Sequence, residues 1–465
     1  AALLATLAGT PAGSLVASEN GIFELNGQKY GFDVASIPDS VFEYAENSVK
    51  DYNFIVKEAD AEGNLTTKRY KINLKPDNFS ASKSITWMEV SKDKKSEAGV
   101  IVAELPRKQS KYFQYTYTKP ADYTESNTRI NDTLSADSVN KVVFKTSDGS
   151  AIYNTKDNSS VNITADFIGN SASLSSMISN RGFIGNISGN FMGNFGQAIY
   201  NSSNGTAIIG DITGDFIGNY ASGKGGAIFN NLGTIGNITG NFIGNYVFNA
   251  NAIGGAIYNS GIIGDITGDF IGNYSSDSVG GAIFNDYDSS IGNIIGDFIG
   301  NHSKAYGGAI NNSGRTAIGN ITGDFIGNYA SYDVGSANGG AIDNIGTIGN
   351  ITGDFIGNYT LGSYSVQGGA IYNSSNGTAI IGDITGNFLS NYVQYLSKYS
   401  KLTLGGAVYS NANLSFTAKG KQRFFSGNYT NDQTRGKNYN ALFVQSVTDL
   451  ASAPVIAFDT AGGGA

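Results

Sequence analysis

The residues best suited to nucleophilic catalysis and to soft metal binding are nearly absent from this chain, which contains one histidine, His302, and no cysteine. Catalytic triads and histidine metal sites need several such side chains at defined geometry. His302 follows residues 298–301 in a stretch of variable sequence, so we interpret it as an exposed loop residue. The composition therefore predicts no catalytic residue, no metal ligand and no cofactor-binding residue.

Carboxylates are the remaining candidates for chemistry, because cleavage of glycosidic bonds usually uses two of them a set distance apart. Glutamate does not occur after residue 150, and most aspartates there recur at regular intervals, as structural positions do. The aspartates outside this pattern are Asp277, Asp286, Asp288, Asp333 and Asp343. We interpret them as solvated loop charges, with the carboxylates of a polysaccharide-degrading enzyme as the alternative.

Four aspartates share one position in consecutive repeats and form what we call the four-aspartate run: Asp269, Asp297, Asp324 and Asp354. If the repeats stack as strands, these carboxyls lie roughly 5 Å apart. Like charges at that distance repel by about 1 kcal/mol per pair near water. The carboxyls can splay into solvent, take up protons or be bridged by cations, and splaying is the expected outcome.

The overall charge excludes one class of partner. The formal net charge is -8, whereas a nucleic-acid-binding protein needs a basic surface. The glycine-rich segments lack the Gly-x-x-x-x-Gly-Lys-[Ser/Thr] pattern of a phosphate-binding loop. We therefore expect no nucleic-acid partner.

Hydrophobic residues make up 40% of the chain, which is enough to build a core. Because the chain has no cysteine, that core is not held by disulfides.

The composition changes near residue 145 and divides the chain, since residues 1–150 hold 18 of the 30 basic residues. Residues 1–18 are predicted to be a leader or signal-peptide remnant, because an apolar run precedes small residues. Residues 19–145 contain alternating and β-branched segments, which predict a β-rich domain. Residues 146–430 are repetitive, and residues 431–465 are predicted to form a terminal coil or the start of further sequence. No segment approaches the roughly 18 to 20 apolar residues of a membrane-spanning helix.

Two short elements alternate from residue 151 to about residue 430. The first is Gly-Gly-Ala-Ile-x-Asn, as in residues 225–230, and the second is Phe-Ile-Gly-Asn-Tyr, as in residues 216–220. The stretch from the first element to the second has nearly constant length, whereas the return stretch varies. One half of each repeat is therefore a frame, and the other half contains a loop that tolerates insertion.

This pattern predicts stacked coils. Strand alternation turns the isoleucine of the first element, such as Ile228, inward, and Phe216 begins a second inward column. One repeat cannot bury such a face alone, but about ten stacked repeats form a continuous core. We predict an all-β fold, a right-handed parallel β-helix (solenoid) with an N-terminal β-rich domain. A hydrogen-bonded column at one corner is also expected: Asn219, Asn245, Asn273, Asn301, Asn328 and Asn358.

The variable segments are the expected recognition surface, because loops on a rigid scaffold carry binding more often than the frame does. We predict that they project on one side of the solenoid and hold the ligand contacts. The candidate aromatic anchors are Tyr332, Tyr364, Tyr395 and Tyr399.

The alternation of Gly-Gly-Ala-Ile (225–228) with Phe-x-x-Asn (216–219) over residues 151–430 resembles the chlamydial polymorphic membrane proteins and related autotransporter passengers. That resemblance implies a parallel β-helix at the bacterial outer-membrane surface, carried in the full-length protein by a C-terminal membrane β-barrel. Adhesion is the usual role in this family. The chain departs from the family in having no cysteine and in inserting Ile-Gly-Asn-Ile-Thr-Gly between the motifs. We expect it to be a truncated passenger from a relative.

Three functions are compatible with these observations. The favoured one is an extracellular adhesin that presents loops to a host-cell or surface receptor, or to a glycan, and catalyses nothing. The second is a polysaccharide-degrading lyase or glycosidase, because pectin lyases and phage tailspikes use the same coil. The third is a structural spacer or filament subunit, whose binding determinants lie outside residues 151–430.

Overall fold

The computed structural model describes seven strand segments between residues 13 and 117 and most of residues 119–459. In the second range the residues left out are 127, 132–138, 146–148, 156–160, 203–205, 277, 375–378, 396–401, 418–424, 427, 433–435, 439–440 and 445–455. The chain divides into two compact units, Ala1–Asp122 and Tyr123–Ala465. Among the described residues, no helix has the length and apolar character needed to cross a membrane.

The first unit is a seven-stranded sheet whose neighbouring strands are mostly antiparallel. Its strands are β1 (Gly13–Ser18), β2 (Ile22–Leu25), β3 (Gln28–Gly31), β4 (Phe54–Ala59), β5 (Leu65–Phe79), β6 (Ser82–Glu89) and β7 (Lys111–Tyr117). These strands agree with the β-rich composition predicted for residues 19–145, but β1 begins before that range and the unit ends at Asp122. Of the predicted leader, residues 13–18 form β1, which pairs with β7, and residues 1–12 lie outside the described residues.

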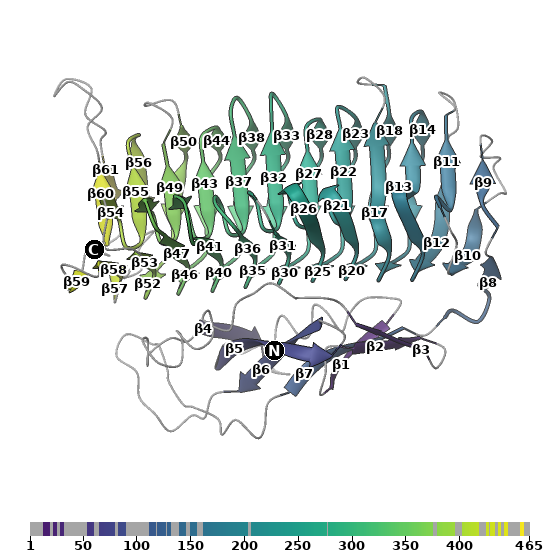
Figure 1. The fold of residues 1–465 in the computed structure, drawn as a ribbon, viewed down its shortest axis with the longest axis horizontal. Coiled ribbons are helices and arrows are strands. Elements are labelled where there is room, and N and C mark those ends of the chain that lie inside the picture. Colours follow the sequence, from purple (N-terminus) through teal and green to yellow (C-terminus); the bar gives the residue numbers. More distant parts are fainter. Residues whose placement is uncertain are drawn as a thin grey trace. The chain divides into compact units, whose positions relative to one another are not determined.

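The second unit is a β-solenoid of about nine turns, in which the strands of each turn pair in parallel with those of the next (Figure 1). One turn contains β27 (Ile257–Asn259), β28 (Ile262–Ile263), β29 (Ile266–Thr267), β30 (Phe270–Ile271) and β31 (Tyr274–Ser275). In the next turn, β32 (Ile283–Asp286) pairs with β27 and β35 (Phe298–Ile299) pairs with β30. The predicted parallel β-helix is confirmed.

The core of the solenoid consists of side-chain columns that run from turn to turn. Ile228, Ile257 and Ile283 are fully buried and lie in register on adjacent parallel strands. Phe216 and Phe242 are also fully buried, and their rings stack with centroids 4.8 Å apart. Both predicted inward columns are therefore confirmed, and stacked rings at this spacing stabilise a core beyond the area that they bury.

The paired glycines of the first element have separate roles, which Gly254 and Gly255 illustrate. Gly254 has a φ of +67°, a left-handed conformation that glycine adopts without strain. Gly255 approaches the next turn so closely that a Cβ there would lie 2.0 Å from the carbonyl oxygen of Gly281. The first glycine therefore permits the corner, and the second permits the turn spacing.

Buried asparagines form hydrogen-bonded columns at two corners. In the predicted column, the Asn273 amide nitrogen donates to Asn301 Oδ1 at 2.9 Å and to the Phe242 carbonyl at 2.8 Å. This column is confirmed. The asparagine that ends the first element forms a second column, in which Asn259 Nδ2 donates to Asn285 Oδ1 at 2.8 Å. Both columns satisfy buried backbone groups at places where the strands end.

The solenoid extends beyond residues 146–430 at both ends. Before this range, β10 (Asn140–Lys145) pairs in parallel with β12 (Ile163–Ile168), so the second unit begins at Tyr123. After it, β60 (Leu442–Val444) and β61 (Ile456–Asp459) pair in parallel with strands of the preceding turn. The described part of residues 431–465 thus contains solenoid strands as well as coil.

Candidate functional site

Three successive variable segments fold into strands of their own, although they were predicted to be loops. These strands are β41 (Tyr329–Tyr332), β42 (Ala337–Asn338), β47 (Tyr359–Gly362), β48 (Ser365–Gln367), β53 (Tyr392–Tyr395) and β54 (Leu402–Leu404). The strands β42, β48 and β54 pair in parallel as a small separate sheet, which we call the insert sheet. The insertions therefore stack from turn to turn as the frame does.

The insert sheet has its own apolar cluster, which explains the placement of two predicted anchors. The cluster contains Ala330, Ala337, Val366, Val393 and Tyr395, with Tyr332 packed against it. Tyr395 is 1% exposed and its hydroxyl donates to the Ser363 carbonyl, so its prediction as a ligand anchor is wrong. Its ring fills the space under the insertion instead. Tyr399 lies outside the described residues.

An exposed ridge crosses the turns at the tips of these insertions. Tyr364 is 62% exposed and Val334 is 71% exposed, and the half-buried ring of Tyr332 has the Lys304 ammonium 5.4 Å from its centroid. The backbone N–H of Ser363 donates to the Gly335 carbonyl at 2.9 Å, which joins the two tips. We call Tyr332, Val334, Tyr364 and Lys304 the insert ridge. Aromatic and apolar faces beside a cation can bind a sugar ring or a protein side chain.

The candidate carboxylates have different surroundings. Asp286 accepts a hydrogen bond from the Tyr258 hydroxyl at 2.7 Å, and burial, followed by this carboxylate, raises the pKa of Tyr258. Asp288 is exposed and lies 4.0 Å from Arg315, and Asp333 is exposed on the turn that carries Val334. Asp277 lies outside the described residues. The solvated interpretation therefore holds for Asp288 and Asp333.

The solvated interpretation is wrong for Asp343, which is 2% exposed. It lies in β43 (Ile342–Asn344), in register between Asn311 and Tyr372 of the adjacent turns. Its Oδ1 atom is buried without a hydrogen-bond partner among the described residues, and burial raises the pKa of this carboxyl well above its usual range. The side chain occupies a position that most turns fill with an aromatic ring.

The interpretation of His302 as an exposed loop residue is also wrong, because its side chain is 5% exposed. It lies in β36 (His302–Ser303), and its ring stacks between Tyr274, at 4.7 Å, and Tyr329, at 3.8 Å. The sequence contained the signal for this, since His302 follows the same Phe-Ile-Gly-Asn element that precedes tyrosine in the neighbouring repeats. Its role is to continue an aromatic column.

The four-aspartate run does not splay into solvent as expected. Asp269 is 5% exposed, whereas Asp297, Asp324 and Asp354 are half-buried. The Asp269 Oδ1 accepts a hydrogen bond from the backbone N–H of Asp297 at 2.8 Å. The same bond recurs from Asp324 to Asp297 at 2.8 Å and from Asp354 to Asp324 at 2.7 Å. Each carboxyl therefore points along the solenoid axis toward the next turn.

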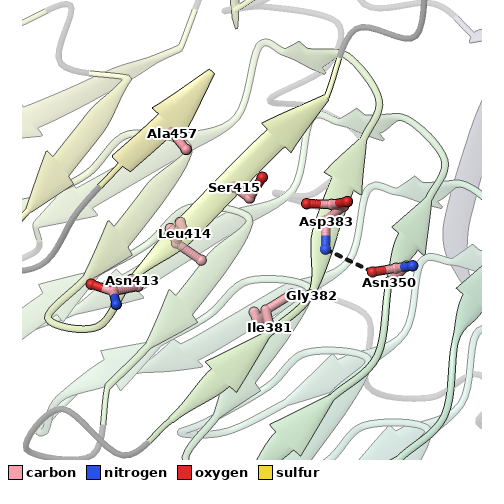
Figure 2. Close-up of a pocket in the computed structure, with 8 residues that line it drawn as sticks. All are labelled: Asn350, Ile381, Gly382, Asp383, Asn413, Leu414, Ser415 and Ala457. Atoms are coloured by element: carbon pink, nitrogen blue, oxygen red, sulfur yellow. Dashed lines mark hydrogen bonds between the residues drawn. The ribbon is translucent and has the colours of Figure 1, made fainter. Parts of the chain in front are cut away.

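A cavity of about 400 Å³ lies where the regular repeat ends (Figure 2). Its lining residues are Asn350, Ile381, Gly382, Asp383, Asn413, Leu414, Ser415 and Ala457. The Asp383 backbone N–H donates to Asn350 Oδ1 at 2.8 Å, and Asp383 is the one carboxylate in the lining. The cavity can accept hydrogen bonds from a polar ligand, but its lining does not supply the carboxylate pair of a glycosidase.

Metal-binding geometry is also absent from the described part of the chain, which contains no group of three or more His, Cys, Asp or Glu side chains placed to hold an ion. Two members of the insert ridge, Val334 and Lys304, were not predicted from the sequence. An apolar residue in a polar turn, Asp333-Val334-Gly335, was the available signal.

No protein-family model, curated protein or solved structure matches this chain. The geometry of the two candidate surfaces, the insert ridge and the cavity at Asp383, therefore carries the functional argument.

Proposed function

We propose that this protein is a non-enzymatic, extracellular adhesin of the bacterial surface, and that it binds a receptor or a glycan through the insert ridge. The observation that carries the proposal is the exposure of Tyr364 and Val334, at 62% and 71%, on insertions that are themselves folded. Large apolar side chains held in water on an ordered surface are typical of interaction sites. The frame contributes rigidity, because its polar corners are satisfied by the asparagine columns.

An enzymatic role has less support from the same residues. Asp286, Asp288 and Asp333 have separate surroundings, Asp343 is buried, and the cavity holds Asp383 alone. A spacer role does not account for the exposed ridge. We therefore favour adhesion over both alternatives.

The test compares binding of the full chain to host cells and to a glycan array before and after changing the ridge. The double variant Val334→Ser/Tyr364→Ala should lower the affinity by about tenfold or more, as expected for a loss of central anchors. Tyr287→Ala is the matched control, because Tyr287 is 77% exposed in the turn after β32, outside the insertions. Equal binding by the ridge variant and the wild type would reject the ridge as the binding surface.

A further inference from the structure

The column of side chains that contains the four-aspartate run also contains asparagines. These asparagines show which hydrogen bonds a carboxylate in this position can accept from the next turn. Asn241 lies one turn after Asp215 in this column, and its Nδ2 donates to Asp215 Oδ1 at 3.0 Å. Asn387 follows Asp354, and its Nδ2 donates to both carboxylate oxygens at 2.9 and 3.0 Å. In these Asp–Asn steps the asparagine side chain donates a hydrogen bond to the carboxylate.

The steps within the run have no such amide. Asp297, Asp324 and Asp354 each donate a backbone N–H to the Oδ1 of the preceding aspartate, but their side chains are acceptors when ionised. The second oxygen of Asp269 is buried and has no hydrogen-bond partner among the described residues. Burying a hydrogen-bond acceptor without a donor lowers the stability of the folded chain, and burying an ionised acceptor lowers it more.

The charged groups that act on the run are themselves carboxyls. The charge of Asp215, two turns earlier, raises the pKa of Asp269. The charge of Asp354, one turn later, raises the pKa of Asp324. Within the described residues, no Lys, Arg or His is among the groups that act on Asp269, Asp297 or Asp324. Protonation of one carboxyl in a neighbouring pair turns it into a hydrogen-bond donor to the other and also removes their repulsion.

We propose that Asp269, Asp297 and Asp324 of the four-aspartate run form a proton-holding spine: adjacent carboxyls share protons along the solenoid axis, so that acid tightens these turns and a rise in pH loosens them. Burial first, and then neighbouring carboxyls, raise the pKa of Asp269 to about 7, and burial raises the pKa of Asp297 and Asp324. These groups bind more protons in the folded chain than in the unfolded one. The stability that they contribute is complete below the unfolded value of 3.8 and is lost as the pH rises through the folded values.

The experiment uses the full chain carrying Asp343→Asn, so that this separate buried carboxyl does not contribute. Infrared absorption of the folded protein should show protonated carboxyl groups at about pH 6, well above the range of ordinary aspartates. Urea unfolding should give a higher midpoint at about pH 5 than at about pH 8. Adding Asp297→Asn/Asp354→Asn should remove most of both signals, because each new amide can donate as Asn241 and Asn387 do.

The matched control is Asp265→Asn, whose wild-type carboxylate accepts the backbone N–H of Asn293 at 2.6 Å in an exposed column. It should leave both signals unchanged. The absence of protonated carboxyls from the folded Asp343→Asn chain would overturn the proposal, and this measurement holds even if the further variants fail to fold. A calcium-dependent rise in stability at about pH 8, lost in the Asp297→Asn/Asp354→Asn chain, would also overturn it, because a cation and not a proton would then join the carboxyls.

Discussion

The imidazole ring of His302 lies parallel to the phenol ring of Tyr329, with the ring centroids 3.8 Å apart. Tyr329 stacks in turn on Tyr359 at 4.9 Å, so the histidine is one member of a buried column of rings. A planar side chain is what this position requires.

The first prediction therefore concerns the shape of residue 302. His302→Phe should fold with a stability close to that of the wild type, whereas His302→Ala should lose roughly 2 kcal/mol because a buried stacked ring is removed. Urea unfolding at neutral pH measures both. Equal losses in the two variants would show that something other than ring stacking fixes this residue.

The second prediction concerns the buried asparagine column. Asn301 accepts a hydrogen bond from Asn273 Nδ2 and donates to Asn328 Oδ1 and to the Phe270 carbonyl. Asn301→Ala leaves these groups buried and unpaired, so we expect a loss of about 3 kcal/mol. Asn293→Ala, in the exposed column, should lose less than about 1 kcal/mol. Chemical denaturation of the two variants side by side provides the check, and similar losses would argue against the column.

The third prediction uses a departure from the repeat. Ser390 occupies the place of the glycine in the Phe-Ile-Gly-Asn turn and has a φ of +56°, which costs about 1 kcal/mol for a residue with a Cβ. Ser390→Gly should therefore raise the unfolding free energy by about that amount. Gly357→Ser, at a φ of +58° in the preceding turn, should lower it similarly. Thermal melting distinguishes the two signs, and a destabilised Ser390→Gly chain would contradict the argument.

The fourth prediction is a pH dependence at Asp343. Burial raises the pKa of this carboxyl well above its usual range, so the native state favours the neutral form. Its contribution to stability is present in acid and is lost as the pH rises through the raised pKa. Asp343→Asn removes the ionisation while keeping the size, and it should raise the urea midpoint at pH 8 more than at pH 5. A variant that is less stable than the wild type at both pH values would show that the carboxyl has a partner that asparagine cannot replace.

The frame of this protein is predictable because its signals repeat. The inward position of Ile228 and Phe216 follows from strand alternation. Because the same alternation recurs in every repeat, each repeat supports the prediction made from the others. The corner column of Asn273 and Asn301 follows in the same way. The second asparagine column, at Asn259 and Asn285, was equally visible in the repeat but was not interpreted.

Two other errors concern residues whose burial depends on segments that are distant in the sequence. Tyr395 is buried because its insertion packs against two earlier insertions. The sequence of one insertion alone does not predict an apolar cluster formed by three of them. Asp343 stands in the place of an aromatic ring, so its burial depends on neighbours from adjacent turns rather than on its own segment. The beginning of the solenoid at Tyr123 was hidden because its first strands lack the glycine and asparagine signals.

The pairing of each turn with the next gives the solenoid a definite response to mechanical load. Within one interface, the bonds between β27 and β32 and those between β30 and β35 act side by side and share a pull along the axis. Successive interfaces act one after another, so each carries the whole force and the chain yields first at the weakest. In the proposed adhesin, the force that breaks the tether would therefore be set by the weakest interface and not by the number of turns.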